Sequence, residues 1–401
     1  MGDQQPDVLV IGAGPAGIAC AYFLQQRGIA YEVADQADVI ASTWAYQYPS
    51  LRLNTTRFYS HLPGAKFPLS FRLFPTARQY HAYLVRFAQR HRLNIRLGVT
   101  VRRVAPEGGG WRVERSDGVF HYAAVVAASG RYPNPYTPRI PGLDAFPGAV
   151  MHAHDYRRPE PFAGQRVMVI GNGPTGVDLA CELPQAADRP VLLAMRTGIR
   201  LKPRWPLGLP KHAWMLLTDR LPARIGVPLE RWIEDISYRN VARWGIKVPS
   251  PDSASGAAGT RGPELIRAVR RGDVRPVDAP LRFEGRAAIM PDGSRLEVDS
   301  VILATGYRPA LAYLDIACET DETGLPLRQR ADYPVYRGYL PHTGYEARGC
   351  PGLYIAGVFY QGRGALHNFN VEGAIIADQI ARRLAQRAAR PTFMSAAPAV
   401  S

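Results

Sequence analysis

Cysteine and lysine are both scarce in this chain, and neither is grouped in a way that builds a site. The cysteines form no Cys-x-x-Cys pair, which argues against a disulfide framework, a zinc site and a redox dithiol. Two of them fall inside expected helices, where a small buried apolar residue is typical. The four positions are Cys20, Cys181, Cys318 and Cys350.

Long hydrophobic runs and targeting signals are also missing. The longest apolar stretch, from Val8 to Leu24, is interrupted by glycines and is too short to span a bilayer. The first residues lack the charged, apolar and small regions that form a signal peptide. We therefore expect a cytoplasmic protein with no membrane partner.

The chain carries a formal net charge of +15, yet lysine supplies very few of its 49 basic residues. The arginines are scattered, and no nucleic-acid-binding module can be recognised. We therefore expect no nucleic-acid partner. Weak attraction to anionic substrates stays open, and so does a homo-oligomer.

Two glycine fingerprints each follow an apolar run and precede an apolar helical pattern. GAGPAG follows the run from Val8 to Ile11, and GNGPTG follows the run from Val167 to Ile170. In such loops the first glycine makes a tight turn, the second admits a pyrophosphate, and the third lets the helix pack on the strand. The phosphates face the helix N-terminus, where unpaired amides favour anions. The predicted contacts are Gly12, Ala13, Gly14, Pro15, Ala16 and Gly17, and Gly171, Asn172, Gly173, Pro174, Thr175 and Gly176.

Two such loops in one chain predict two bound dinucleotides, typically a flavin and a nicotinamide nucleotide that exchange a hydride. Asp35 ends the second expected strand and is predicted to bind ribose hydroxyls, with the mid-strand Glu32 as its rival. Arg196 stands at the same place in the second fold, which suits a 2′-phosphate and predicts NADPH there. Three further basic residues either assist or form a solvated loop: Arg200, Lys202 and Arg204.

These patterns predict an α/β protein with two Rossmann-like dinucleotide-binding domains, the NADPH domain being inserted into the FAD domain. We expect the FAD domain in residues 1–159 and 301–390. The NADPH domain is expected in residues 160–300, with a helical insertion at about 205–246. Residues 391–401 are expected to form a frayed tail.

Periodicity predicts the main elements within these domains. Helical spacing predicts helices over residues 78–91 and 371–386 and a helical pair over residues 211–244. Alternation and apolar runs predict strands near residues 97–104, 125–128 and 353–356, with a hairpin over residues 111–122. Residues 249–262 are expected to be a polar loop.

A segment between the two domains resembles the FxGxxxHxxxY signature of class B flavin-dependent monooxygenases. It matches that signature at Phe146, Gly148, His152 and Tyr156. The sequence LATGY at residues 303–307 is similar to the FATGY motif of the same family. The resemblance covers nearly the whole chain.

Two further segments agree with this resemblance. The sequence SLRLNTT at residues 50–56 is similar to a family segment that lines the flavin, and Asn54 matches its asparagine. In the family that asparagine touches the flavin adduct and the nicotinamide, so Asn54 is the predicted catalytic residue. Trp44 matches a family tryptophan, but Ala41 and Ser42 replace the paired glycines before it.

The resemblance implies an NADPH- and O₂-dependent FAD monooxygenase. In this family a flavin hydroperoxide oxygenates a soft nucleophile, an amine nitrogen or thioether sulfur of a small molecule, while the signature segment joins the domains. Baeyer–Villiger members have tryptophan where this chain has Tyr156, which disfavours lactone formation. The chain length resembles the plant YUCCA branch, which has histidine at the position of Asn54. Oxidative decarboxylation of a 2-oxo acid, as in that branch, stays an alternative.

Further cofactor contacts are expected around the two fingerprints and near the C-terminus. His367 and Asn370, expected on the loop before the last helix, either touch flavin or substrate or are ordinary loop residues. The remaining predicted cofactor-binding residues are Gln36, Trp44, Val101, Ser129, Thr197, Thr305, Gly306, Gly357 and Asn368.

Two competing hypotheses remain from the sequence. One is an NADPH-dependent flavin reductase or oxidase that passes electrons to a quinone or another acceptor. The other is a cofactor-binding redox sensor without turnover. Neither the substrate nor the oligomeric state follows from the sequence, because specificity in such folds lies in loops.

Overall fold

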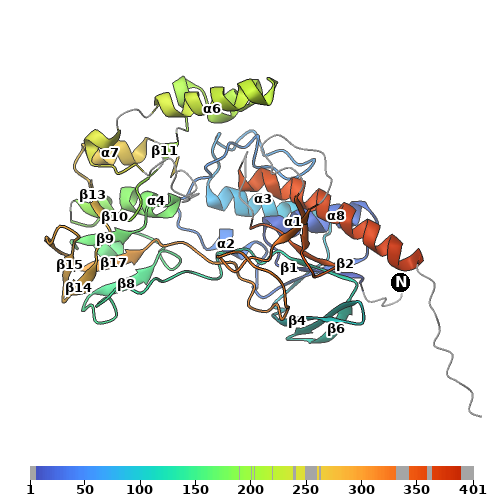
Figure 1. The fold of residues 1–401 in the computed structure, drawn as a ribbon. Helices are drawn as coiled ribbons and strands as arrows, with labels where there is room; N and C mark the ends of the chain where they lie inside the picture. Colours follow the sequence, from blue (N-terminus) through green and yellow to red (C-terminus); the bar gives the residue numbers. More distant parts are fainter. Residues whose placement is uncertain are drawn as a thin grey trace, which may run out of the picture.

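The computed structural model describes residues 6–188, 190–199, 201–202, 204–218, 220–237, 241–248, 260–261, 263–330, 343–358 and 364–389. Figure 1 shows two lobes side by side, each built on its own β-sheet, with α6 (Ala223–Ser237) lying above them. The predicted tail and most of the predicted loop at 249–262 lie outside the described residues. Among the described residues, no helix combines the length and hydropathy that a bilayer crossing requires.

The first lobe contains a seven-stranded sheet whose strands come from both ends of the chain. The strand order is β18-β19-β20-β7-β1-β2-β3, and the five strands from β20 to β3 are parallel. Every residue of the central strand β1 is buried, as expected of a strand covered on both faces. The strands are β1 (Val8–Ile11), β2 (Tyr31–Asp35), β3 (Ile95–Leu97), β7 (Ala124–Ala127), β18 (Arg328–Arg330), β19 (Thr343–Ala347) and β20 (Leu353–Ile355).

Helices cover one face of this sheet and a small antiparallel sheet covers the other. The helical face is a single hydrophobic cluster that joins α1 (Pro15–Gln26), α3 (Ala77–Arg90) and α8 (Ala365–Ala389) to the sheet. On the opposite face, Trp111 and Val113 pack with the strands of the main sheet. Their small sheet consists of β4 (Val101–Glu107), β5 (Gly110–Arg115) and β6 (Gly118–Tyr122).

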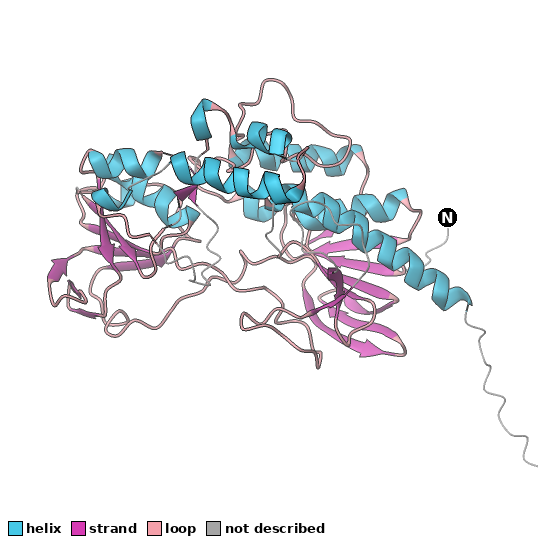
Figure 2. Cartoon of the chain, turned by 45° about the horizontal axis from the view of Figure 1, so that its top comes forward, coloured by secondary structure: helices cyan, strands magenta, loops and turns pink. Residues whose placement is uncertain are grey.

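The second lobe repeats this plan with a five-stranded, fully parallel sheet of order β13-β10-β9-β17-β8. Helices lie on one of its faces, and a second antiparallel sheet lies on the other. Figure 2 shows the helices of both lobes gathered on one side and the two sets of strands below them. The strands are β8 (Ala149–His152), β9 (Val167–Ile170), β10 (Val191–Met195), β13 (Val274–Asp278) and β17 (Ser300–Leu303), with β14 (Arg282–Glu284), β15 (Ala287–Ile289) and β16 (Arg295–Glu297) in the small sheet.

This arrangement confirms the predicted fold class, two Rossmann-like lobes with the second inserted into the first. The chain crosses to the second sheet before Ala149 and leaves it after Leu303. The first and last strands of this crossing, β8 and β17, are hydrogen-bonded neighbours in the second sheet. The remaining elements are α2 (Ser42–Ala45), α4 (Pro174–Glu182), α5 (Lys211–Thr218), α7 (Glu264–Arg270), β11 (Leu201–Lys202), β12 (Thr260–Arg261), and the short helices η1 (Glu160–Phe162), η2 (Leu183–Gln185), η3 (Pro206–Gly208) and η4 (Val241–Trp244).

Most predicted elements are found, and the differences have local causes. The predicted strand near residues 97–104 is two strands, because Gly98 adopts φ +70 between β3 and β4. Helix α3 begins one residue before its predicted start, at a capping box in which Thr76 and Gln79 satisfy each other's backbone N–H groups. The last helix, α8, starts at Ala365, so His367, Asn368 and Asn370 are helical and do not lie on a preceding loop as predicted.

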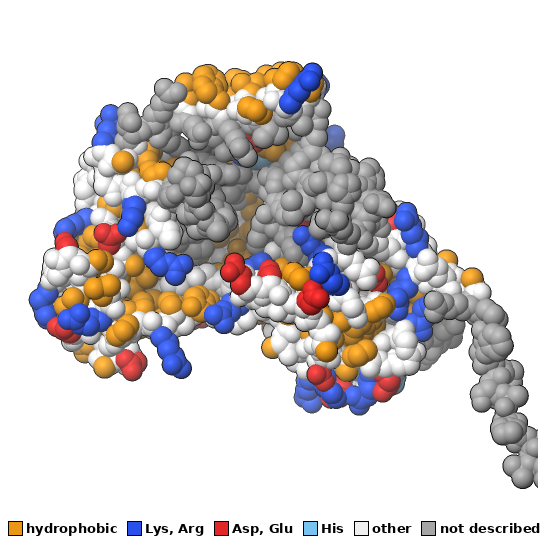
Figure 3. All heavy atoms as spheres, viewed as in Figure 1, with side chains coloured by type: hydrophobic (Ala, Val, Ile, Leu, Met, Phe, Trp, Pro, Cys, Tyr) orange, Lys and Arg blue, Asp and Glu red, His pale blue; other side chains and the backbone are white. Residues whose placement is uncertain are grey.

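The predicted helical insertion contains α5 and α6 and carries much exposed apolar surface. Figure 3 shows hydrophobic side chains spread over the upper face formed by α6. Part of this surface is the exposed set Leu207, Leu209, Leu216, Leu217, Ile225 and Trp232.

All four cysteines are free thiols, so the prediction of no disulfide agrees with the structure. Two of these cysteines are nevertheless close together in the structure although they are far apart in the sequence. Cys318 and Cys350 lie in one hydrophobic cluster on the first lobe, and their thiols are hydrogen-bonded. Burial raises the pKa of both thiols, which keeps them protonated and poorly reactive.

Glu372 is a fully buried carboxyl group inside the first lobe. Its Oε2 accepts a hydrogen bond of 2.8 Å from the backbone N–H of Gly357, just after β20. Burial raises the pKa of Glu372 to about 8, and the nearby Arg328 only partly opposes this. The folded protein therefore holds a proton that the unfolded chain releases as the pH rises above the ordinary carboxyl pKa.

We expect Glu372→Gln to stabilise the protein in alkaline solution. Since the folded pKa is raised, the wild type loses stability as the pH rises from the ordinary carboxyl value toward about 8. Glutamine has no proton to lose and can still accept the bond from Gly357. Melting temperatures of both proteins, measured across this pH range, should diverge in favour of the variant. A constant difference at every pH would contradict the buried, titrating carboxyl.

Candidate cofactor and active site

Backbone contacts leave no room for a side chain at the first and third glycines of the first glycine loop. Gly12 has φ +108, and a Cβ there would lie 2.7 Å from the carbonyl oxygen of Ala128. A Cβ on Gly17 would lie 1.9 Å from the carbonyl oxygen of Gly12. A Cβ on Gly14 would meet nothing within 4 Å. The loop is therefore packed at its first and third glycines and open at its second.

The second loop repeats this geometry. Gly171 has φ +121, and a Cβ there would lie 2.2 Å from the carbonyl oxygen of Ala304. A Cβ on Gly176 would lie 2.0 Å from the carbonyl oxygen of Gly171, while Gly173 again faces open space. Both loops thus present the cradle that a pyrophosphate needs.

Each loop leads into a helix whose first amides have no side-chain cap. Gly14 and Gly173 are the N-cap residues of α1 and α4, and Pro15 and Pro174 follow them at the first turn. Glycine has no side-chain oxygen that could cap these amides, so their N–H groups and the helix dipole remain available to an anion. The remaining loop residues, Ala13, Ala16, Asn172 and Thr175, lie in the same two turns.

Asp35 lies at the carboxyl end of β2, beside the first loop. Its Oδ2 accepts a hydrogen bond of 2.6 Å from the N–H of Ala13, and its Oδ1 accepts one of 2.8 Å from the N–H of Ala37. The carboxylate is thus fixed at the rim of the loop, with the exposed Gln36 next to it. This is the position that ribose recognition requires.

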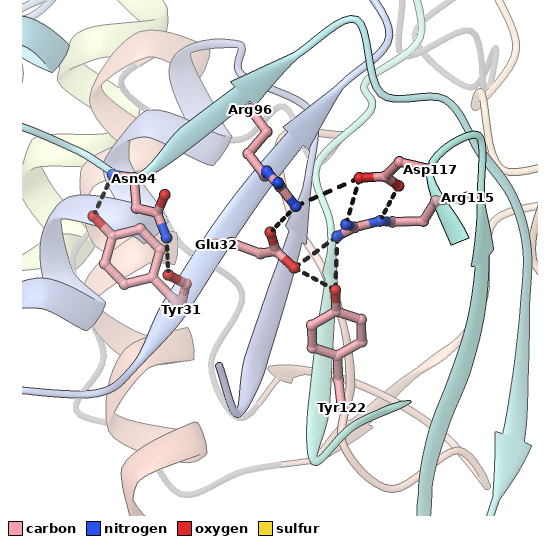
Figure 4. A network of polar contacts seen from close by, with 7 residues as sticks. All are labelled: Tyr31, Glu32, Asn94, Arg96, Arg115, Asp117 and Tyr122. Atoms are coloured by element: carbon pink, nitrogen blue, oxygen red, sulfur yellow. Dashed lines mark hydrogen bonds and ion pairs between the residues drawn. The ribbon is translucent and has the colours of Figure 1, made fainter. Parts of the chain in front are cut away.

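The rival carboxylate, Glu32, has a different environment. It is buried between the main sheet and the β4–β6 sheet, where Arg115 donates to it at 2.6 Å and Tyr122 also donates to it (Figure 4). Arg115 in turn binds Asp117 with two nitrogens. Glu32 therefore joins the two sheets and points away from the glycine loop.

In the second lobe, the residue at the position that corresponds to Asp35 is Arg196. It lies immediately after β10, and its side chain is exposed. Thr197 follows it and is half-buried, and the side-chain amide of Asn172 donates to the carbonyl of Gly198. This places the turn after β10 against the second glycine loop. Arg200 lies outside the described residues, as does the side chain of Lys202.

The return segment of the chain packs directly on the first loop. Gly357 has φ +79, and a Cβ there would lie 2.7 Å from the Cβ of Ala16. Gly364, also at positive φ, makes the turn into α8 against Thr55. Asn368 is buried in the first turn of that helix, where its N–H donates to the carbonyl of Gly364. The start of α8 therefore lies beside the loop that carries residues 54 and 55.

The other predicted contacts occupy the ends of strands or the linkers between lobes. Ser129 donates to the carbonyl of Ala310 at 2.7 Å, and Thr305 donates to the carbonyl of Tyr136 at 2.5 Å. Gly306 has φ +90 and follows β17. Val101 is at the start of β4, and Trp44 packs edge-on against Tyr80.

The linker signature is a packing motif in this structure. A Cβ on Gly148 would lie 2.1 Å from the carbonyl oxygen of Asp299, and Phe146 packs against Phe283. His152 ends β8, its Nδ1 accepts from the N–H of His154, and burial lowers its pKa. Tyr156 is buried and stacks on Phe162. These contacts fit the predicted role of joining the domains.

Two polar contacts that the sequence did not reveal connect the lobes. Tyr48, from the first lobe, donates at 3.0 Å to Asp178 of α4, whose pKa burial raises to about 6. Arg204 donates at 3.3 Å to Oδ1 of Asn54 and at 3.2 Å to Glu264. Arg204 was expected either to assist phosphate binding or to be solvated, and it instead hydrogen-bonds these two residues. Only packing could have indicated these pairs, since the partners are far apart in the sequence.

Each lobe has the geometry to hold one dinucleotide at its glycine loop. Both loops lie at the carboxyl ends of the central strands, which is where ligands bind in parallel sheets. Asn54 lies at the boundary between the two lobes, as its bond to Arg204 shows. Among the described residues, no cluster of histidine, cysteine or acidic side chains could hold a metal ion.

Comparisons with known proteins agree with this geometry. A family profile described as pyridine nucleotide-disulphide oxidoreductase matches residues 9–203. The probable indole-3-pyruvate monooxygenase YUCCA8 of Arabidopsis thaliana is 31% identical over 329 residues, covering 76% of this chain and 75% of the relative.

Two solved structures share the fold. A double mutant of the flavin monooxygenase from Stenotrophomonas maltophilia has a TM-score of 0.73 at 24% identity, over 94% of this chain and 99% of that one. The bacillithiol disulfide reductase of Staphylococcus aureus has a TM-score of 0.67 at 18% identity, over 94% of this chain and 98% of that one. At such identities these structures show the fold alone.

The glycine geometry predicts that two alanine variants of the first loop fail in different ways, one in stability and the other in flavin binding. Gly17→Ala forces a Cβ onto the carbonyl of Gly12 and should destabilise the flavin-free protein by about 3 kcal/mol. Gly14→Ala meets open space, so it should cost at most about 1 kcal/mol while lowering flavin retention, because its methyl group blocks the phosphate approach. Urea unfolding of the stripped proteins and the flavin content after purification measure the two effects. Full flavin retention by Gly14→Ala would contradict the cradle.

Proposed function

Since this chain belongs to the flavin-dependent monooxygenase family that includes the plant YUCCA enzymes, we propose that it oxygenates a soft nucleophile of a small molecule. The nucleophile is an amine nitrogen or a thioether sulfur. The protein is an oxidoreductase of the flavoprotein monooxygenase class, with FAD and NADPH as cofactors. We further propose that it acts in the cytoplasm on a small-molecule substrate and O₂, with no nucleic-acid or membrane partner.

The observation that carries the proposal is the hydrogen bond from Arg204 to Asn54, which joins the two lobes that each carry a glycine loop. Bound FAD would accept a hydride from NADPH and activate O₂, so the protein's task is to bind, orient and exclude water. One oxygen atom goes to the substrate, and the other leaves as water with the two electrons of NADPH and two protons. Asn54 would donate or accept a hydrogen bond at the reacting face of the flavin or at the nicotinamide amide.

The other residues have binding roles in this proposal. The loops at Gly12–Gly17 and Gly171–Gly176 would hold the two pyrophosphates against the N-termini of α1 and α4. Asp35 would bind ribose hydroxyls of FAD, since its carboxylate is fixed beside Ala13. Arg196 would bind the 2′-phosphate of NADPH, since it is exposed at the end of β10.

A second candidate function is oxidative decarboxylation of a 2-oxo acid. The identity with a relative named as an indole-3-pyruvate monooxygenase favours it. It ranks second because Asn54 replaces the histidine of that branch at the position proposed to touch the reacting groups. The flavin reductase hypothesis has weaker support, since the reductase structures that share the fold are 18% and 23% identical and show the fold alone.

Isotopically labelled dioxygen distinguishes these functions. We give purified enzyme NADPH with, in separate reactions, tertiary amines, thioethers, 2-oxo acids or a quinone. We expect it to place one labelled oxygen in an N-oxide or sulfoxide for each NADPH consumed. Mass spectrometry of the products and NADPH absorbance provide the two measurements. Label only in a carboxylic acid formed from a 2-oxo acid would favour the second candidate. NADPH consumption that yields reduced quinone or hydrogen peroxide, without labelled product, would contradict both.

Arg196→Ala should raise the KM for NADPH about tenfold or more and leave the KM for NADH within about twofold. The reason is that only NADPH carries the phosphate that the guanidinium would bind. Arg282→Ala is a matched control, because that arginine is paired with Glu284 on the outer β14–β16 sheet. Steady-state kinetics with both nucleotides give the comparison, and equal changes for the two nucleotides would remove Arg196 from the phosphate site.

A further inference from the structure

Arg204 belongs to the second lobe but makes its contacts at the boundary with the first. It follows β11 and is mostly buried, with 13% of its side chain exposed. One nitrogen of its guanidinium donates to Oε1 of Glu264 at 3.2 Å, and another donates to Oδ1 of Asn54 at 3.3 Å. The arginine thus connects the start of α7 with the residue proposed to act at the flavin.

The chain after Arg204 also lies on the first lobe, so this contact is part of a larger interface. The guanidinium lies 5.3 Å from the ring centre of Phe74, and Trp205 packs edge-on against the same ring at 5.9 Å. Further along, His212 stacks on Tyr59 at 4.6 Å. Residues 204–212, which we call the strap, therefore contact the first-lobe segment 54–74 at both of their ends.

The chemistry of the two side chains fixes how Asn54 is turned. A guanidinium can only donate hydrogen bonds, whereas an asparagine amide has one accepting and one donating end. Asn54 must therefore present its oxygen to Arg204 and its NH₂ group in another direction. The salt bridge to Glu264 and the ring of Phe74 hold the guanidinium in place.

The buried position of Arg204 also lowers the stability of the folded protein. Its Nε is buried without a hydrogen-bond partner among the described residues. A buried donor without a partner lowers the free energy of unfolding, so packing alone does not account for an arginine at this position.

We propose that Arg204 is a positioning residue that orients the Asn54 amide so that its N–H donors serve the oxygenation site. This inference rests on the role of Asn54 proposed above. Arg204 contributes no group to the reaction and no contact to the 2′-phosphate. Because Arg204 comes from the second lobe, Asn54 is correctly oriented only when the two lobes are in contact.

Release of hydrogen peroxide by the purified holoenzyme, with NADPH and O₂ and no added substrate, tests this inference. Loss of the oriented amide should let activated oxygen escape as peroxide. Since a hydrogen bond to a charged group is involved, we expect Arg204→Met to raise the release rate about tenfold, and we expect the same of Asn54→Ala. The double variant should match Asn54→Ala alone, because both changes remove one interaction. Arg204→Lys, which keeps a donor, should lie between the wild type and Arg204→Met.

Three further measurements separate orientation from general damage. The KM for NADPH should stay within about twofold in Arg204→Met, unlike in Arg196→Ala. The losses of melting temperature in the two single variants should be less than additive in the double variant, which reports the contact without any turnover. Arg103→Met is the matched control, because this exposed arginine pairs with Glu114 and Asp315 away from the strap, and its peroxide release should equal that of the wild type.

Each outcome decides the inference. Unchanged peroxide release in Arg204→Met, or effects that simply add in the double variant, would overturn it and leave the proposed function intact. A raised KM for NADPH as the main effect would assign Arg204 to nucleotide binding and also overturn it. Rapid peroxide release by the wild type would contradict the proposed function, and the inference with it.

Discussion

Contact between the first and third glycines of each fingerprint is the constraint on which the rest of this structure depends. In both loops the Cα of the third glycine lies so close to the carbonyl of the first that no Cβ fits between them. This close packing holds the start of α1 and α4 against the ends of β1 and β9, with uncapped amides facing outward. The middle glycine then borders open space, and an anion can approach the backbone there. A single side chain at the wrong glycine would remove both the packing and the site.

Insertion of one lobe into the other turns two separate cradles into one site. The chain leaves the first sheet before β8 and returns after β17, and the two crossings lie side by side where Pro135 is bridged to Tyr307. The signature residues between the lobes pack this junction, as the buried Tyr156 and the close approach at Gly148 illustrate. The strap then adds a second connection on the other side, from Arg204 to Asn54 and from His212 to Tyr59. The protein's own contribution to catalysis is therefore mainly geometric, and the cofactors supply the redox chemistry.

Local patterns predicted those features in which neighbours in sequence are neighbours in space. The two loops, the buried strands around them and the antiparallel hairpin all depend on short periodicities, and the structure has them. Asp35 could be placed at the end of β2 by counting from Gly12, and Glu32 could not be excluded until its partner Arg115 was known. The start of α8 was missed because the turn at Gly364 depends on its packing against Thr55.

The sequence by itself determined the two nucleotide cradles, because a tight turn, a close helix and a free amide are all properties of a few consecutive residues. Only the tertiary structure decided which side chains meet across the lobes: Arg204 with Asn54, Tyr48 with Asp178, and the thiols of Cys318 and Cys350. Such pairs join residues far apart in the chain, and their contact depends on how whole sheets and helices pack. No local periodicity records that packing, so these partners become visible only in the folded molecule.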